Sequence, residues 1–313
     1  MYKRQRYVSD KLINRVEKVM KDLNYQPNLL AGSLRKKKTG TIGLVIPDSS
    51  NMLFADISKC FEDIFFLKNY NIIVCNSAYD LDREVEHLKN LRSKMVDGIL
   101  MIPSTLEGGH IKKIQSSGIP VVILDRKIPG LKVDYIMGDS YRGGFEAGRY
   151  ITDMGHSDIG YIDWINTHFH STERKKGFEA ALLKKGMKLP KKRIAKGGLA
   201  YHGGVEAVKK LIEDDSGLTA IFAFNDTNAL GAIKGLTDLG YKVPDDISVM
   251  GYDDIHLSSV FIPGLTTMHY PVKKLTSEAS RVLLDRIKQP IFSNYKEILI
   301  EPKLIIREST KAR

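Results

Sequence analysis

Short runs of consecutive apolar residues alternate with longer segments of helical periodicity along most of the chain. From residue 41 onward, TIGLVIPD, IIVCNS, DGILMIPS and PVVILDR are predicted strands. The segments between them, at 52–69, 82–95 and 110–117, place apolar residues three and four positions apart and are predicted helices. Continuous apolar strands joined by helices are typical of a parallel sheet covered on both faces, so this part of the chain indicates one doubly wound unit.

The alternation restarts after DYIMGDS at 134–140 and predicts a second unit of the same kind. Its expected helices are 141–155, 173–186 and 205–215, with strands at IGYIDW, TAIFAF and ISVMGY. The run KEILIEPKLIIRES would supply a last pair of strands. The predicted fold class is therefore α/β, with two doubly wound parallel-sheet subdomains and a cleft between them.

Polar side chains end two of the predicted strands of the second unit. Asn225 and Asp226 follow TAIFAF, and Asp253 and Asp254 follow ISVMGY. A helix lies between them and ends at Gly240. Because ligands of such sheets bind outside the carboxyl ends of the strands, we expect these four side chains to share one rim.

The first 40 residues differ from the rest in charge. They hold eleven Lys or Arg against three acidic residues, a net +8 of the total +11, which leaves the remaining chain close to neutral. A helix starting after Ser9 carries an apolar stripe through Leu23, and a second short helix is expected at 28–35. A solubilising tail usually shows charge without such periodicity, so we favour a polyanion-binding head.

Composition excludes several classes of protein. The length of 313 residues suggests roughly two domains, and no apolar run approaches the roughly 18 residues of a membrane span. With no apolar leader at the basic N-terminus, we expect a cytoplasmic protein that does not contact a membrane. Cys60 and Cys75 lack motif spacing, and neither a metal site nor a cofactor is expected. The sequence contains no G-x-S-x-G, P-loop or dinucleotide turn, so we do not expect an enzyme.

The order and spacing of several motifs resemble the LacI/GalR (lactose-repressor) family of bacterial transcription regulators. They are N-D-x-x-A-x-G-A from residue 225, L-G-Y-x-V-P-D-D-I-S-V-x-G-Y-D-D from 239 and P-x-L-T-T at 263–267. The resemblance implies a DNA-binding transcriptional regulator of the repressor type. Its DNA binding would be controlled by a small-molecule effector, a sugar or related metabolite, in the cleft. It also implies a homodimer that binds operator DNA in the full-length protein.

The resemblance implies a division of the chain. Residues 1–40 would be a partial DNA-binding headpiece, its third helix and hinge helix, and 41–313 the effector-binding and dimerisation domain. One subdomain would comprise about 41–138 plus 270–300, and the other about 139–269 plus 301–313. Family members carry a complete helix-turn-helix, and only MYKRQR precedes Tyr7 here. We favour a fragment or a miscalled start over the alternative, a natural variant that lacks the reading head.

Motifs Y-x-P-N and A-x-S-L-R resemble the family's hinge helix, which lies in the DNA minor groove. Leu34 matches the leucine that wedges between base pairs, although a plain packing role in a linker is the alternative. The other residues that the resemblance places at DNA are Asn28, Ala31, Ser33 and Arg35.

The candidate effector-binding residues are Asp253, Arg174, Asn225, Asp125, Phe54 and Trp164. By resemblance, carboxylates accept ligand hydroxyls, the Arg174 guanidinium donates in a fork and Asn225 supplies an amide. Helix capping or pairing across the cleft is the alternative for each. Trp164 would stack on a sugar ring or simply pack, and Arg126 would reach an acidic ligand or a surface partner.

A second class of function remains open at this point. A solute-binding protein, taking up a sugar without binding DNA, would share the two-subdomain body. It would need an export signal, whereas residues 1–40 offer a hinge helix, so we favour the regulator.

Overall fold

The N-terminal unit of the chain is described separately from the rest. In this computed structural model, the structure describes residues 9–23, 38–164, 169–198, 200–289 and 293–313. The chain divides into Met1–Thr39 and Gly40–Arg313. In the first unit, helix α1 (Asp10–Asp22) follows Ser9, which occupies the N-cap position but makes no side-chain capping bond. The five DNA candidates, Asn28, Ala31, Ser33, Leu34 and Arg35, lie outside the described residues.

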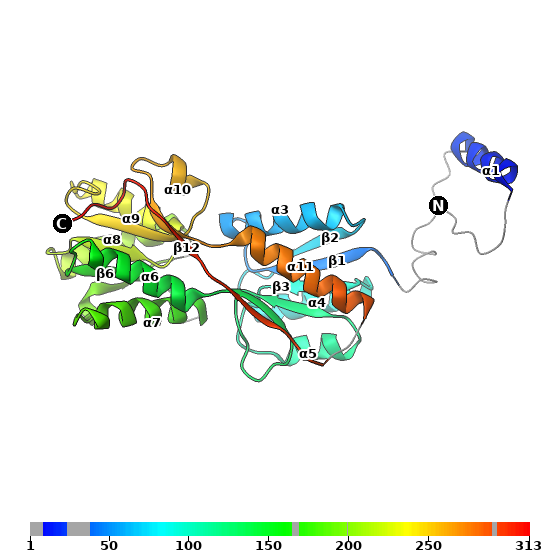
Figure 1. Ribbon diagram of the computed structural model, residues 1–313, viewed down its shortest axis with the longest axis horizontal. Helices are drawn as coiled ribbons and strands as arrows, with labels where there is room; N and C mark the ends of the chain where they lie inside the picture. The colour runs from blue at the N-terminus through cyan, green and yellow to red at the C-terminus, as the bar shows by residue number, and fades with distance from the viewer. Residues whose placement is uncertain (1–8, 24–37, 165–168, 199, 290–292) are drawn as a thin grey trace. The chain divides into compact units, whose positions relative to one another are not determined.

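The second unit, Gly40–Arg313, contains two lobes, each built on a six-stranded sheet (Figure 1). The sheet of the first lobe has the order β11-β5-β4-β3-β1-β2. Its strands are β1 (Thr41–Ile46), β2 (Asn71–Asn76), β3 (Gly98–Met101), β4 (Val121–Leu124), β5 (Asp134–Gly138) and β11 (Glu297–Ile300). Its helices are α3 (Met52–Phe66), α4 (Leu81–Ser93), α5 (Gly109–Ser116) and α11 (Val272–Lys288). All paired strands in this sheet are parallel.

The sheet of the second lobe repeats this strand order as β12-β10-β9-β8-β6-β7. Its strands are β6 (Ile159–Asp163), β7 (Ile194–Lys196), β8 (Ala220–Ala223), β9 (Ser248–Asp253), β10 (Thr266–His269) and β12 (Lys303–Ile305). Its helices are α6 (Ser140–Asp153), α7 (Phe169–Lys184), the short 3-10 helix η1 (Lys191–Arg193), α8 (Tyr201–Asp214), α9 (Asp226–Asp238) and α10 (Leu257–Val260). Only β12 among the described strands pairs antiparallel, with β10.

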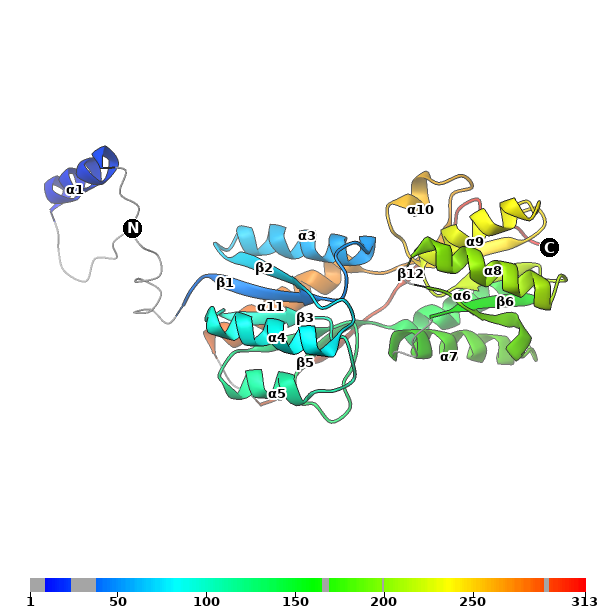
Figure 2. The same ribbon diagram turned by 180° about the vertical axis from the view of Figure 1, so that it is seen from behind.

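Helices cover both faces of each sheet, which explains the continuous apolar strands (Figure 2). In the first lobe, α3 and α11 pack on one face and α4 and α5 on the other. In the second lobe, α6 and α7 oppose α8 and α9 in the same way. The predicted fold class, two doubly wound parallel-sheet subdomains, is thereby confirmed.

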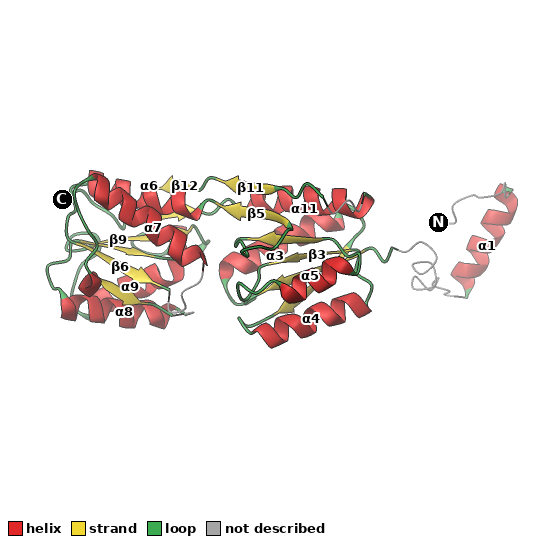
Figure 3. Ribbon diagram, turned by 90° about the horizontal axis from the view of Figure 1, so that it is seen from below, coloured by secondary structure: helices red, strands yellow, loops and turns green. Residues whose placement is uncertain are grey.

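Three stretches of chain connect the lobes. The chain passes from β5 into α6 near Asp139, returns from β10 into α11 near Tyr270, and passes from β11 into β12 near Glu301 (Figure 3). Both sheets therefore present the carboxyl ends of their parallel strands toward these connections, where the loops that follow the strands can meet.

Two strands of the second lobe, β7 and β10, are not among the elements predicted from the sequence. β7 has three residues and β10 has four, too few for a periodic pattern. Among the described helices, none combines the length and the apolar character needed to cross a membrane.

Candidate ligand-binding site

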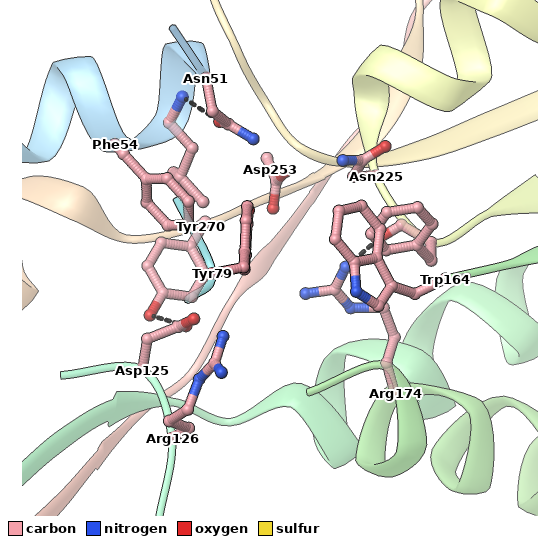
Figure 4. A pocket seen from close by; sticks show the side chains of 12 residues that line it. Asn51, Phe54, Tyr79, Asp125, Arg126, Trp164, Arg174, Asn225, Asp253 and Tyr270 are labelled. Carbon is pink, nitrogen blue, oxygen red and sulfur yellow. Dashed lines mark hydrogen bonds between the residues drawn. The ribbon is translucent and has the colours of Figure 1, made fainter. Parts of the chain in front are cut away.

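A pocket lies where the loops of the two lobes meet, with an empty volume of about 620 Å³ that is partly open to solvent (Figure 4). Its lining residues are Asn51, Leu53, Phe54, Tyr79, Asp125, Arg126, Trp164, Arg174, Phe224, Asn225, Asp253 and Tyr270. All six residues selected from the sequence as candidate ligand contacts are in this set. Aromatic walls with a few convergent polar groups are typical of sites for small molecules.

Asp125 brings a carboxylate to the pocket from the end of β4. Its backbone is left-handed, with φ 67°. Tyr270, on the connection between β10 and α11, donates a hydrogen bond of 2.7 Å from its hydroxyl to Asp125 Oδ1. Burial, reinforced by the Asp125 charge, raises the pKa of Tyr270 well above its usual range, so the hydroxyl keeps its proton. A residue of the connection thus orients a carboxylate of the first lobe.

Asp253 brings the second carboxylate from the end of β9. It is only 8% exposed and has φ 116°, a conformation uncommon outside glycine. Among the described residues, no group donates a hydrogen bond to its side-chain oxygens. Burial raises the pKa of Asp253 well above its usual value, and nearby Arg174 opposes that rise. A buried carboxylate without donors is costly to the fold, and strained backbone of this kind clusters at functional sites.

Arg174, on α7, faces the same space from the second lobe. Its Cζ lies 3.3 Å from the centroid of the Tyr252 ring, and its Nη1 donates to the carbonyl oxygen of Phe224. Within the described part of the chain its buried Nε has no partner. The guanidinium is therefore held in place on one side while retaining donors for a ligand.

Arg126 faces the pocket from the first lobe. Its side chain is 5% exposed, which in this conformation removes it from contact with a surface partner. Nη1 donates to the Ser104 carbonyl at 3.3 Å, and Nε is buried without a partner among the described groups. Burial lowers the pKa of Arg126. The pocket thus contains one carboxylate and one guanidinium from each lobe.

Three other polar residues considered from the sequence are committed to the fold to different extents. Asn225 caps α9, since its Oδ1 accepts from the Asn228 backbone N–H at 2.9 Å, and its amide nitrogen is left to face the pocket. Asp226 is fully buried, and its carboxylate accepts hydrogen bonds from the backbone N–H of Ile255 and from the hydroxyl of Ser258, both in the segment after β9. Asp254 pairs with Arg307 at 2.6 Å and with His269 at 2.9 Å. Helix capping and ligand contact are therefore compatible at Asn225, whereas Asp226 and Asp254 do not line the pocket.

Aromatic rings form much of the remaining wall. Trp164 is 7% exposed and packs edge-on against Phe224, with ring centroids 4.8 Å apart. Phe54, on α3, is also buried and lines the pocket from the first lobe. The Trp164 side chain thus packs against Phe224 and also borders the cavity, where a ligand can reach it.

Close packing between α6 and α7 sets the position of Arg174. A Cβ atom at Gly144 would collide with the backbone carbonyl of Arg174, and one at Gly177 would collide with that of Tyr141. A Cβ atom added at Gly148 would come within 2.8 Å of the Ala181 Cβ. The Gly143-Gly144 pair lacks dinucleotide-binding spacing in the sequence. Gly144 serves helix packing next to the pocket, and Gly143 leaves room for the Tyr252 and Pro302 side chains.

Substituting Gly144 with alanine is expected to destabilise the protein by about 2–3 kcal/mol, because overpacking forces backbone shifts. The shift would also displace Arg174 and weaken ligand binding. Chemical denaturation measures the stability loss. Gly109→Ala is the matched control, since no atom lies within 4 Å of its added Cβ and alanine favours a helix. Equal stability of the two variants would contradict this account of the helix contact.

Comparison with known proteins identifies the family. Residues 149–310 match the model of the periplasmic binding protein-like domain. Over 307 residues the chain is 35% identical to the HTH-type transcriptional repressor PurR of Mannheimia succiniciproducens, an alignment that covers 98% of this chain and 92% of that protein. The chain belongs to the LacI/GalR family of transcriptional regulators.

Other members of the LacI/GalR family agree with this assignment. Catabolite control protein A of Priestia megaterium is 33% identical over 304 residues, covering 95% of this chain and 90% of that protein. A solved structure of a LacI family transcriptional regulator from Enterococcus faecium, with bound ribose, is 30% identical and has a TM-score of 0.79. It covers 87% of this chain and 99% of that chain. The two curated relatives are transcriptional regulators and not enzymes.

Sequence reasoning missed several pocket residues of this LacI/GalR family member. Tyr79, Tyr270, Asn51, Leu53 and Phe224 line the pocket but were not selected as contacts. Leu53 and Phe224 had a usable signal, because they directly precede the selected candidates Phe54 and Asn225. Within the described residues, no cluster of three or more His, Cys, Asp and Glu side chains is placed to hold a metal ion.

Proposed function

We propose that the protein is a DNA-binding transcriptional repressor whose effector is a small neutral sugar bound between the two lobes. The observation that supports this most is the pairing of Asp125 and Arg126 from one lobe with Asp253 and Arg174 from the other around one pocket. Carboxylates accept hydrogen bonds from sugar hydroxyls and guanidinium groups donate to them, while aromatic walls contact the apolar faces of the ring.

Charge balance favours a neutral ligand over an anionic one. Two carboxylates face two guanidinium groups, so the four side chains carry no net charge when all are ionised. The Enterococcus faecium relative, which has bound ribose, adds support for a sugar. Binding a ligand to both lobes would favour one angle between them, and we propose that this population shift controls DNA binding.

We further propose that residues 1–40 belong to the DNA-binding headpiece and that Leu34, Asn28, Ala31, Ser33 and Arg35 contact operator DNA. The net +8 of this segment supports phosphate contact.

We also propose a homodimer, supported by apolar side chains exposed on the second unit, such as Phe66 at 76% and Ile262 at 91%. Sedimentation velocity measures the assembly, and a monomer at micromolar concentration would contradict it.

A titration with pentoses, hexoses, sugar phosphates and nucleobases tests the proposal. Trp164 is the single tryptophan of the chain and lines the pocket, so its emission reports binding directly. We expect saturable 1:1 binding of at least one neutral sugar, measured by calorimetry and by a change in Trp164 fluorescence. Binding of sugar phosphates alone, or of nucleobases alone, would contradict a neutral sugar as effector.

A DNA-binding assay separates the regulator from the alternative, a sugar-binding protein without DNA-binding activity. The DNA upstream of the protein's own gene is the probe, in an electrophoretic mobility shift at low salt. The regulator predicts a shift whose midpoint changes when the bound sugar is added. Sugar binding without any DNA shift would favour the alternative.

A further inference from the structure

An aromatic contact joins the two lobes beside the polar groups of the pocket. Tyr79 belongs to the first lobe, on the loop after β2, and Trp164 follows β6 of the second lobe. Their ring centroids are 5.9 Å apart at an interplanar angle of 49°. Trp164 continues the contact to Phe224, and all three rings line the pocket. Figure 4 shows Tyr79 and Trp164 at the pocket. The rings thus form a continuous aromatic wall from one lobe to the other.

The backbone holds Tyr79 in this place at a conformational cost. Ala78 and Tyr79 are consecutive left-handed residues, with φ 53° and 58°. Such conformations are uncommon for residues with a side chain and persist only where surrounding structure imposes them. The imposing contacts are backbone hydrogen bonds, from Ala78 N to Pro47 O at 2.8 Å and from Asp80 N to Ser77 O at 2.9 Å. The loop is therefore built to aim the ring across the cleft.

Tyr79 is also the member of the wall that faces solvent. It is half-buried, whereas Trp164 and Phe224 are buried. Burial raises the pKa of the Tyr79 hydroxyl, which Arg126 opposes and Asp48, Asp125 and Asp253 increase. Its hydroxyl therefore remains protonated among the charged groups of both lobes, between the pocket interior and the outside.

We propose that Tyr79 and Trp164 form an aromatic gate that closes the pocket over its ligand and limits the ligand to an unsubstituted monosaccharide. This inference rests on the proposed function for the nature of the ligand, but the contact between the rings exists without a ligand. If the anomeric hydroxyl of the bound sugar faces the gate, a substituent on its oxygen would have to displace Tyr79. The gate therefore excludes glycosides by occupied volume and not by the loss of a hydrogen bond.

Quenching of Trp164 by acrylamide tests the gate in the ligand-free protein. Because the chain has a single tryptophan, all of the tryptophan emission comes from this position. In Tyr79→Ala the quenching constant is expected to rise at least threefold over the wild type, since the shielding ring is removed. Tyr79→Phe keeps the ring and is expected to match the wild type. Equal quenching in all three proteins would overturn the gate.

Binding of a sugar and its methyl glycoside tests the selectivity, with D-ribose and methyl ribofuranoside as the first pair. The wild type and Tyr79→Phe are expected to prefer the free sugar by at least tenfold, and Tyr79→Ala to reduce this preference at least fivefold. An unchanged preference in Tyr79→Ala would overturn the selectivity. If no protein binds any free sugar, the proposed function fails, and the quenching comparison still decides the gate.

Discussion

Replacing Asp253 with asparagine is expected to weaken sugar binding by about 30-fold or more, roughly 2 kcal/mol, the contribution of a hydrogen bond to a charged group. The carboxylate lines the pocket and, within the described residues, receives no hydrogen bond from the protein. A ligand hydroxyl would supply the missing donor. Calorimetric titration of wild type and variant with the same sugar measures the loss. Asparagine keeps the shape and tolerates the left-handed backbone, so the comparison isolates the charge.

The same substitution should leave the fold intact or stabilise it by up to about 2 kcal/mol, since a buried carboxylate without donors is unfavourable. The pH dependence has a defined sign. Burial raises the pKa of Asp253 in the folded state, so its contribution to stability is present below the ordinary carboxyl pKa and is lost as pH rises through the folded pKa. The advantage of Asp253→Asn should therefore grow with pH. A variant less stable than the wild type at neutral pH would contradict this role.

Replacing Asp226 with alanine is expected to destabilise the second lobe by about 3–5 kcal/mol, because three buried donors would lose their acceptor. Asp226 Oδ2 accepts from the Ile255 backbone N–H at 2.9 Å and from the Ser258 hydroxyl at 2.7 Å. Asp226 Oδ1 accepts from the Thr267 hydroxyl at 2.5 Å. One carboxylate at the start of α9 thus holds three further segments together: the loop after β9, helix α10 and strand β10. A loss of this size is a large fraction of the stability of a typical domain.

Thermal and urea denaturation of Asp226→Ala beside Asp253→Asn provide the contrast. Both positions are buried carboxylates, and burial is the main reason that the pKa of each is raised. They differ in their hydrogen bonds, so the first variant should lose stability and the second should lose sugar binding. Asp226→Asn is expected to fall between, because its amide can accept only part of what the carboxylate accepts. Equal stability of Asp226→Ala and the wild type would remove Asp226 from this role.

The distinction between Asp226 and Asp253 shows where sequence reasoning reaches its limit. Both follow apolar strands of a parallel sheet, which is enough to place them at one rim. Which of them turns toward the pocket depends on backbone angles and on partners such as Thr267, 41 positions away in sequence. Periodicity predicted most strands of the two sheets and most of the helices that cover them, since these depend on local patterns, from a strand of 6 residues such as β1 to a helix of 16 such as α7. Helix α11, which covers the first sheet, was not among the predicted elements.

The residues missed in the pocket have specific physical reasons. Tyr79 reaches the pocket through two consecutive left-handed residues, and neither alanine nor tyrosine favours that conformation. Tyr270 lies on a connection between lobes, and its hydroxyl meets Asp125 from 145 positions away. Arg126 was considered from the sequence, but its burial depends on contacts such as the Ser104 carbonyl, 22 positions away. These contacts arise from the assembly of the lobes and leave no local pattern.

A crystal structure of the protein with the sugar that binds best in the titration tests the account most directly. We expect one sugar between the lobes, with hydroxyls within hydrogen-bond distance of Asp253 and Arg174 from one lobe and Asp125 from the other. Its ring should lie against the aromatic wall that contains Trp164. A sugar bound to one lobe only, or outside this pocket, would contradict the account.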